Sequence, residues 1–183
     1  MDKTLDVLII GGGIGGLATA LSLHDIGLRP RIFEQAKEIR PLGVGINLLP
    51  HSVRELTELG LLKELNATGV EIDELRFYTQ YGLEIQREPR GTKARYKWPQ
   101  FSINRGELQM LLYRAVLERL GPDCIRTAHT AADVTQDNGK VSVSFKDSAT
   151  GESLTTEPAD IVIAADGVHS IIRKKYYPDE GSP

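Results

Sequence analysis

Residues 4–35 read TLDVLIIGGGIGGLATALSLHDIGLRPRIFEQ, and this stretch decides the fold because it holds a strand, a glycine turn, a helix and a second strand. Leu5 to Ile10 is a nearly continuous apolar run, which is typical of a parallel strand buried on both faces. A helix is predicted to begin at about Ile14 and to end near Gly27. The second strand is predicted at residues 30–33. The stretch therefore predicts the first half of a doubly wound α/β fold.

The turn between the first strand and the helix has the glycine order GxGxxG, at Gly11, Gly13 and Gly16. These glycines permit a tight turn, a close approach of the backbone to a pyrophosphate and close packing of the helix on the strand. With Ile14 and Gly15 they form the helix start, where unpaired amides and the positive end of the helix dipole can bind an anion. The pattern predicts a dinucleotide site; the alternative is a glycine turn that binds nothing.

Glu34 ends the second strand, roughly 20 residues beyond the glycines. A carboxylate at this place can accept hydrogen bonds from both hydroxyls of an adenosine ribose. FAD and NAD remain open at this point, because both present the same adenosine diphosphate. The carboxylate would repel a ribose phosphate, which disfavours NADP in this site.

Composition places the chain among ordinary globular proteins. It has 183 residues, of which 40% are hydrophobic and 26% charged, with a net charge of −3. That charge argues against nucleic-acid and membrane-surface partners, and no apolar run is long enough to span a bilayer. Cys124 is the single cysteine, so an internal disulfide and a cysteine-cluster metal site are excluded, and we expect it to be buried in a strand. The histidines lack metal-ligand spacing, and the N-terminus lacks a signal-peptide layout, so we expect a cytoplasmic protein without a metal site.

Residues 36–50 read AKEIRPLGVGINLLP and predict a loop, followed by a short strand, that returns to the cofactor. Gly43 and Gly45 would let the backbone approach a ligand closely, and Arg40 could contact a phosphate. A surface loop with a solvated arginine is the alternative.

The chain changes character near residue 70. Residues 51–66 predict two short helices separated by Gly60. Residues 73–88 show the alternating side-chain pattern of strands and predict a hairpin with its turn at Tyr81-Gly82. Residues 96–103 predict another strand. The aromatic residues here fit either one wall of a substrate pocket or a sheet core beside a solvated basic loop. They are Phe77, Tyr78, Tyr81, Tyr96, Trp98 and Phe101.

A helix is predicted from Asn104, its N-cap, to Leu120, with Gly121-Pro122 ending it. Arg105 lies in its first turn, where a cation opposes the helix dipole unless an anion is nearby. Arg105 is therefore either an anion-binding residue or a plain surface arginine.

The last part of the chain predicts a meander and a second glycine turn. Strands are expected at residues 124–128 and, in an antiparallel meander, at 131–135, 140–146 and 153–156. Residues 160–164 then predict a buried parallel strand, followed by Asp166-Gly167. These two residues would lie at the carboxyl end of the strand, where ligands bind in open α/β sheets. A short helix should begin at about His169, with His169 and Ser170 capping or packing it. GxSxG is absent, so nothing points to a hydrolase.

Four motifs together resemble one family. GGGIGG with Glu34, RPLGVGI at 40–46, INRGELQ at 103–109 and DIVIAADGVHSIIRK at 160–174 are similar to the FAD-dependent aromatic hydroxylases of the para-hydroxybenzoate hydroxylase type, the class A monooxygenases. EIRPLGVGIN and RGELQM are especially similar to phenazine-modifying members. The resemblance implies an α/β fold: a Rossmann-like FAD-binding parallel sheet of the glutathione reductase type, an antiparallel β-meander crossover and the start of a substrate-domain sheet.

The resemblance also implies roles for the candidate residues. Glu34 would bind the adenosine ribose of FAD, the backbone at Gly45 and Ile46 would lie against the flavin, and Arg105 would reach the phosphates or ribityl chain. Asp166, paired with Gly167, would contact the flavin side of the cofactor near the path of NAD(P)H. The implied reaction is reduction of the flavin by NAD(P)H, formation of a flavin hydroperoxide with oxygen, and hydroxylation of a small aromatic substrate.

The implied domains are a discontinuous FAD-binding domain, 1–70 with 101–183, and inserted substrate-domain strands at 71–100. Members of the family continue past residue 183 into more of the substrate sheet, a Gly-Asp motif and a helical section. Both domains are therefore expected to be incomplete, and the isolated chain to be inactive. The alternatives are a truncated, non-catalytic FAD-binding or partner-binding module and an NAD-dependent reductase.

Overall fold

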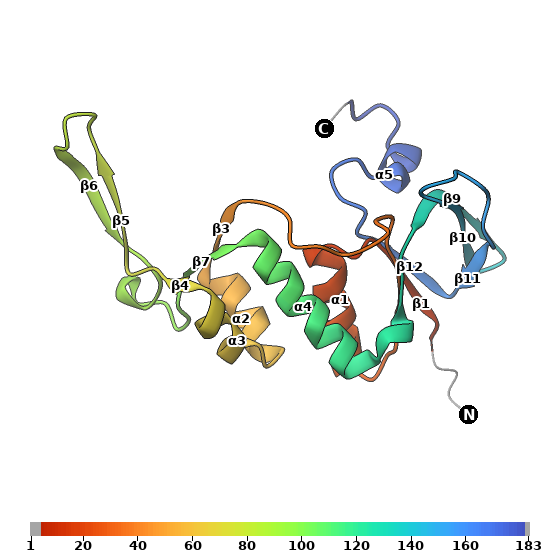
Figure 1. Cartoon of the computed structure of the whole chain (residues 1–183), viewed down its shortest axis with the longest axis horizontal. Coiled ribbons are helices and arrows are strands. Elements are labelled where there is room, and N and C mark those ends of the chain that lie inside the picture. The colour runs from red at the N-terminus through yellow and green to blue at the C-terminus, as the bar shows by residue number, and fades with distance from the viewer. Residues whose placement is uncertain (1–4, 182–183) are drawn as a thin grey trace. The chain divides into compact units, whose positions relative to one another are not determined.

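A computed structural model describes residues 5–181, and Figure 1 shows the course of the chain. In chain order the elements are β1 (Val7–Ile10), α1 (Ile14–Asp25), β2 (Arg31–Phe33), β3 (Gly45–Leu48), α2 (Pro50–Glu58), α3 (Leu62–Thr68), β4 (Val70–Glu71), β5 (Glu74–Tyr78), β6 (Glu84–Pro89), η1 (Gly91–Ala94), β7 (Phe101–Asn104), α4 (Arg105–Leu120), η2 (Pro122–Cys124), β8 (Ile125–Arg126), β9 (His129–Asp137), β10 (Lys140–Asp147), β11 (Glu157–Ala159), β12 (Ile161–Ala164) and α5 (Ile171–Tyr176). None of the helices in this described part combines the length and the apolar character needed to cross a membrane.

The chain forms two compact units. One is Met1–Arg40 with Leu112–Pro183, and the other is Pro41–Leu111, so α4 begins in one and ends in the other. Compactness alone gives neither unit a function. The predicted division into an FAD-binding domain and inserted substrate-domain strands at 71–100 therefore stays a prediction.

The first unit is built on a four-stranded parallel sheet in the order β12-β1-β2-β8. β1 lies in the interior of this sheet and its four residues are at most 3% exposed. Leu17, Ala20 and Leu21 of α1 are fully buried. The strand, helix and strand predicted for the opening stretch are therefore present, and the predicted α/β fold with a parallel sheet is confirmed.

A three-stranded antiparallel sheet, in the order β11-β10-β9, forms the meander. The prediction of its third strand at 153–156 is wrong: Ser153 makes only an isolated bridge to Lys146, and the strand is Glu157–Ala159. Ala159 packs in the same buried cluster as Phe33 and Phe145. Leu154 also packs against this cluster, and its N–H donates to the carbonyl of Phe145 at 2.9 Å, but it is only partly buried, and the continuous ladder with β10 is formed by Glu157–Ala159.

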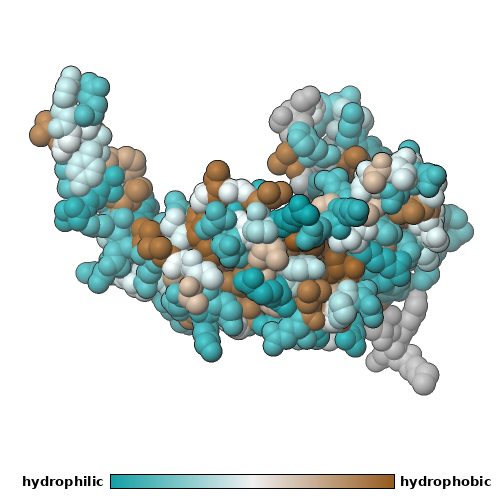
Figure 2. All heavy atoms as spheres, viewed as in Figure 1, coloured by the Kyte–Doolittle hydropathy of each residue, from teal (hydrophilic) through white to brown (hydrophobic). Residues whose placement is uncertain are grey.

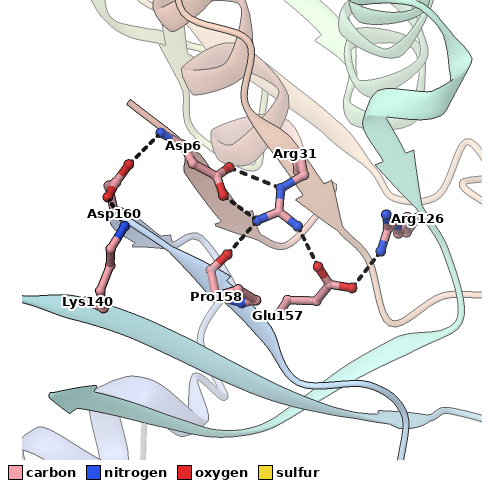
Figure 3. A network of polar contacts seen from close by, with 7 residues as sticks. All are labelled: Asp6, Arg31, Arg126, Lys140, Glu157, Pro158 and Asp160. Atoms are coloured by element: carbon pink, nitrogen blue, oxygen red, sulfur yellow. Dashed lines mark hydrogen bonds and ion pairs between the residues drawn. The ribbon is translucent and has the colours of Figure 1, made fainter. Parts of the chain in front are cut away.

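Polar contacts join the meander to the parallel sheet (Figure 3). Arg31 on β2 donates to Asp6, at 3.1 and 2.9 Å, and to Glu157 at 2.5 Å and the carbonyl of Pro158 at 2.7 Å. Arg126 donates to the other oxygen of Glu157 at 2.6 Å. Arg31 thus binds residues at two distant places in the sequence, Asp6 and the adjacent pair Glu157 and Pro158.

Two expectations for this unit are corrected. β12 was predicted as a buried strand, yet Ile161 is 41% exposed, because β12 is an edge of the sheet with β1 on one side. Cys124 was expected in a buried strand, yet it ends η2 and is half-buried, because Gly121 with φ of 88° and Pro122 turn the chain before β8 begins. Partial burial raises the pKa of the Cys124 thiol.

The second unit contains the sheet β3-β7-β4, the helices α2 and α3, and the hairpin β5-β6. The helix pair and the hairpin agree with the sequence. The strand predicted at 96–103 is shorter, Phe101–Asn104, because Arg95 takes a left-handed conformation that closes the η1 turn. Phe101 is buried in the core, whereas Phe77, Tyr78 and Tyr81 are exposed on the hairpin, whose apolar side chains contribute brown surface to Figure 2.

Candidate cofactor-binding site

The glycine turn after β1 is closely packed. The N–H of Gly11 donates to the carbonyl of Phe33 at 2.8 Å, and its φ is 107°. A Cβ at Gly11 would lie 2.3 Å from the carbonyl oxygen of Ala165, and a Cβ at Gly16 would lie 1.9 Å from that of Gly11. Side chains are excluded at both positions, so the first turn of α1 can approach β1 and the 165–167 turn.

Gly13 and Gly15 differ from these two glycines, since a Cβ there would meet nothing within 4 Å. Gly13 is the N-cap of α1 and supplies no side-chain cap. The first amides of an α-helix have no partner inside the helix, and the dipole places positive charge at this end. The opening beside Gly13 is therefore a backbone cradle into which an anionic pyrophosphate fits.

Glu34 follows the last residue of β2, and two hydrogen bonds to its carboxylate hold the side chain in place. One oxygen accepts from the N–H of Gly12 at 2.6 Å and the other from the N–H of Ala36 at 2.7 Å. A carboxylate has about four acceptor sites, so each oxygen keeps capacity for a further donor. The side chain can hold the glycine turn and accept ribose hydroxyls together.

The second glycine turn follows β12. The N–H of Ala165 donates to the carbonyl of Ile10 at 2.8 Å, which continues the pairing of β12 with β1. The carboxylate of Asp166 accepts from the N–H of Ile171 at 3.1 Å, and Ser170 caps α5 by accepting from the N–H of Arg173. The predicted capping role of Ser170 is confirmed, and Asp166 shares it.

A cavity of about 230 Å³ joins these features at the carboxyl ends of β1, β2 and β12. Among the predicted residues, it is lined by Gly11, Gly13, Glu34, Asp166 and Gly167. Ile14, Gly15 and Gly16 form the adjoining first turn of α1.

Arg40 is outside the lining of this cavity. It is exposed and paired with Glu38 at 2.6 Å.

The cavity also contains residues that the sequence analysis did not identify. His129 lies edge-on to Phe33, with ring centroids 5.4 Å apart, and Phe33 stacks on Phe145 at 4.5 Å. Its Nδ1 is 2.6 Å from the carbonyl oxygen of Thr127. Phe33 and His129 line the cavity together with Ala131 and Ile171. In the sequence, Phe33 and His129 are marked only by their position next to the end of a strand, and many other residues share that position.

Gly45, Ile46 and Arg105 belong to the second unit, and β3 and β7 bring them together. Gly45 pairs with Asn104, and Ile46 with Ile103. The N–H of Arg105 donates to the carbonyl of Val44 at 3.0 Å, and a Cβ at Gly43 would lie 3.2 Å from the Arg105 side chain. Asn104 caps α4 by accepting from the N–H groups of Gly106 at 2.8 Å and Glu107 at 3.3 Å, as predicted.

The residues of the first unit fit the adenosine diphosphate end of FAD. The open cradle at Gly13 suits a pyrophosphate, and Glu34 retains acceptors for the ribose. Ile10, Phe33, Ala131 and Ile171 add apolar wall to the same cavity.

Comparisons with known proteins agree with this geometry. A family model described as FAD binding domain matches residues 4–179. Phenazine 1,6-dicarboxylic acid hydroxylase of Lysobacter antibioticus is 44% identical over 175 residues, which are 95% of this chain and 43% of that protein. 3-Amino-4-hydroxybenzoate 2-monooxygenase of Streptomyces cremeus is 33% identical over 183 residues, which are 98% of this chain and 44% of that protein.

A solved structure shows the same fold. The p-nitrophenol 4-monooxygenase of Pseudomonas putida DLL-E4 aligns with a TM-score of 0.84 at 21% identity, over 96% of this chain and 44% of that one. The chain thus spans less than half the length of these relatives. The family model covers nearly all of the chain, and the resemblance to class A flavin monooxygenases is confirmed: the chain belongs to the FAD binding domain family.

Proposed function

We propose that this chain is the FAD-binding portion of an NAD(P)H- and oxygen-dependent monooxygenase that hydroxylates a small aromatic compound. The observation that carries the proposal is the cavity where Gly13, Glu34 and Asp166 meet at the carboxyl end of the parallel sheet. The names of the two curated relatives, a phenazine dicarboxylic acid hydroxylase and an aminohydroxybenzoate monooxygenase, support the reaction and the aromatic substrate class.

In this proposal the residues of the chain bind and orient the cofactor. The first turn of α1, from Gly13 to Gly16, receives the pyrophosphate, and Glu34 accepts the ribose hydroxyls. Gly45 and Ile46 present backbone to the flavin, while Arg40 and Arg105 offer cations to the phosphates or the ribityl chain. The chemistry that FAD supplies when bound is hydride acceptance from NAD(P)H and oxygen activation.

The setting we propose is the cytoplasm, without a nucleic-acid or membrane partner. The net charge of −3 supports this, since such partners favour a basic face.

The first prediction separates cofactor binding from turnover. Isothermal titration of the 183-residue chain with ADP should show binding, FAD should bind weakly, and NAD(P)H oxidation should not respond to aromatic compounds. The reason is that Gly13 and Glu34, the residues proposed for the adenosine diphosphate end, line one cavity on this chain, whereas the relatives extend to more than twice its length. Robust substrate-dependent oxidation by these residues alone would contradict the proposal.

Two other outcomes would indicate different functions. Tight binding of NAD without FAD would indicate an NAD-dependent reductase. Tight, stoichiometric FAD binding by a monodisperse chain, without any reaction when the longer protein is assayed, would indicate a non-catalytic FAD-binding module.

A further inference from the structure

The wall of the cofactor cavity beside Glu34 includes His129, the first residue of β9. The backbone N–H of His129 donates to the carbonyl of Glu34 at 2.9 Å, so the two residues are direct neighbours. In an adenosine diphosphate the ribose joins the pyrophosphate on one side to the base on the other. With the ribose hydroxyls on Glu34 and the pyrophosphate at Gly13, the base is directed away from the glycine turn, and His129 is available to it.

Three contacts fix the side chain of His129 before any ligand binds. Its Nδ1 is 2.6 Å from the carbonyl oxygen of Thr127. Its ring centroid is 5.4 Å from that of Phe33 and 5.7 Å from that of Phe145, in both cases edge-on. Both phenylalanines are almost fully buried and stack on each other. A ring held in this way loses little conformational freedom when it binds a ligand, which favours a recognition role.

The backbone before His129 is strained in a way that serves this arrangement. Ala128 has a φ of 59°, a left-handed conformation that alanine rarely adopts. The N–H of Ala128 donates to the carbonyl of Ala36 at 3.0 Å, and its own carbonyl accepts from the N–H of Ser148 at 3.1 Å. These neighbours hold the turn in which the carbonyl of Thr127 meets the ring two residues later. Strained backbone held by its surroundings is often found at binding sites.

The contact with Thr127 also decides which nitrogen of the neutral ring carries the proton. A carbonyl oxygen can only accept a hydrogen bond, so Nδ1 is the donor and Nε2 of the neutral ring is an acceptor. Nε2 has no hydrogen-bond partner among residues 5–181. The neutral ring therefore has one polar atom left for a ligand in the cavity, and that atom can only accept.

A fixed acceptor discriminates between purine bases. Adenine has an amino group at the ring position where hypoxanthine and guanine have a carbonyl oxygen, so adenine offers a donor and the other two offer an acceptor. Gln35 and Thr130 also line the cavity, but an amide and a hydroxyl can each donate or accept and would suit either kind of base. Among these three side chains, His129 alone is restricted to one role.

We propose that His129 makes this site selective for adenine, with its Nε2 accepting a hydrogen bond from the amino group of the base. A base with an oxygen at that position would bring two acceptors together and leave both unpaired. The site would thus reject inosine and guanosine nucleotides, which have the same ribose and phosphates as the adenosine nucleotide. This proposal rests on the proposed function, because it names the residue that reads the base of the bound dinucleotide.

The test compares ADP with IDP, the inosine nucleotide, by isothermal titration of the 183-residue chain. The titrations are run at about pH 8.5, where histidine side chains are ordinarily neutral. ADP should bind about tenfold more tightly than IDP or better, as expected when a hydrogen bond is replaced by two facing acceptors. Equal affinities of the wild type for ADP and IDP would overturn the proposal.

A variant assigns the preference to His129. His129→Phe keeps a ring against Phe33 and Phe145 but has no nitrogen, so the ratio of the IDP and ADP Kd values should fall to within about threefold of one. A purely structural role would weaken both nucleotides equally and leave the ratio unchanged, which would refute the proposal. His51→Phe is the matched control: His51 is exposed on α2, outside the cavity lining, and its replacement should leave the ratio as in the wild type.

NMR of the histidine ring nitrogens gives a measurement that does not depend on how well the variant folds. In the wild type at the same pH, Nδ1 of His129 should carry the proton, and the Nε2 resonance should shift on addition of ADP but not of IDP. A proton on Nε2 of the neutral ring would overturn the proposal.

The outcomes also separate this proposal from the proposed function. Binding of ADP and IDP without preference would remove the role of His129 and leave the adenosine diphosphate site standing. Binding of neither nucleotide would remove the site itself, and the role of His129 with it.

Discussion

At the scale of single residues, Glu34 combines a structural and a binding role. Its carboxylate accepts from Gly12 at the glycine turn and from Ala36 after β2, while it lines the cavity. The two hydrogen bonds that fix the glycine turn therefore also hold the carboxylate at the cavity, where its oxygens can accept further hydrogen bonds from a ligand. A neutral amide cannot reproduce both contacts, because its NH₂ group would face a backbone N–H.

We therefore expect Glu34→Gln to lower the affinity for ADP about tenfold or more and to lower the free energy of unfolding by about 1–2 kcal/mol. Isothermal titration with ADP and urea unfolding measure the two effects. Glu38→Gln is the control, since Glu38 is exposed and pairs with Arg40. Equal ADP affinities in the two variants would mean that the ribose contact is misassigned.

At the scale of elements, the glycines at the start of α1 have two different roles: some are needed for the fold, and one is needed for the ligand. A Cβ at Gly16 would collide with the carbonyl of Gly11, whereas a Cβ at Gly13 would enter open space in the cavity. Gly16→Ala should therefore destabilise the chain by about 1–3 kcal/mol or more. Gly13→Ala should change stability by about 1 kcal/mol or less but weaken ADP binding.

Thermal unfolding and ADP titration of both variants check this prediction. A stable Gly16→Ala, or a Gly13→Ala that binds ADP as well as the wild type does, would contradict the roles assigned to the turn.

A second element-level prediction concerns Arg31 on β2. Its side chain is 26% exposed and Glu157 is 15% exposed, so removing the cation leaves a poorly solvated carboxylate with Arg126 as its remaining partner. Arg31→Met should lower the free energy of unfolding by about 1–3 kcal/mol. Arg76→Met on the β5-β6 hairpin, which loses a more exposed pair with Glu74, should cost about 0–1 kcal/mol. Equal losses in urea unfolding would show that the Figure 3 network adds nothing special.

At the scale of the whole molecule, the edge of the parallel sheet is open at β12. Ile161 is exposed there, and unpaired strand edges with apolar side chains promote association. Ile161→Lys should reduce the concentration-dependent light scattering of the chain. Ile26→Lys replaces an isoleucine that is also exposed but lies at the end of α1, so it should have no such effect. If both variants scatter like the wild type, the edge does not drive association.

Local signals predicted much of the fold and part of the site. The apolar run at β1, the glycine order and the Asn104 cap depend on residues close together in the chain, and each appears as predicted. The rest depends on long-range pairing. The third meander strand is the segment that forms a ladder with β10, Glu157–Ala159, and the place of His129 depends on its ring contacts with Phe33 and Phe145.

The sequence by itself determined the glycine turn, the acid at the end of β2 and the order of the four motifs, because turn chemistry and periodicity act over a few residues. Only the tertiary structure decided that Gly13, Glu34 and Asp166 share one cavity and that Gln100 is buried. The reason is physical. Cavities arise where segments far apart in the sequence pack together, and the free energy that selects this packing comes from burial of side chains whose partners the local sequence does not specify.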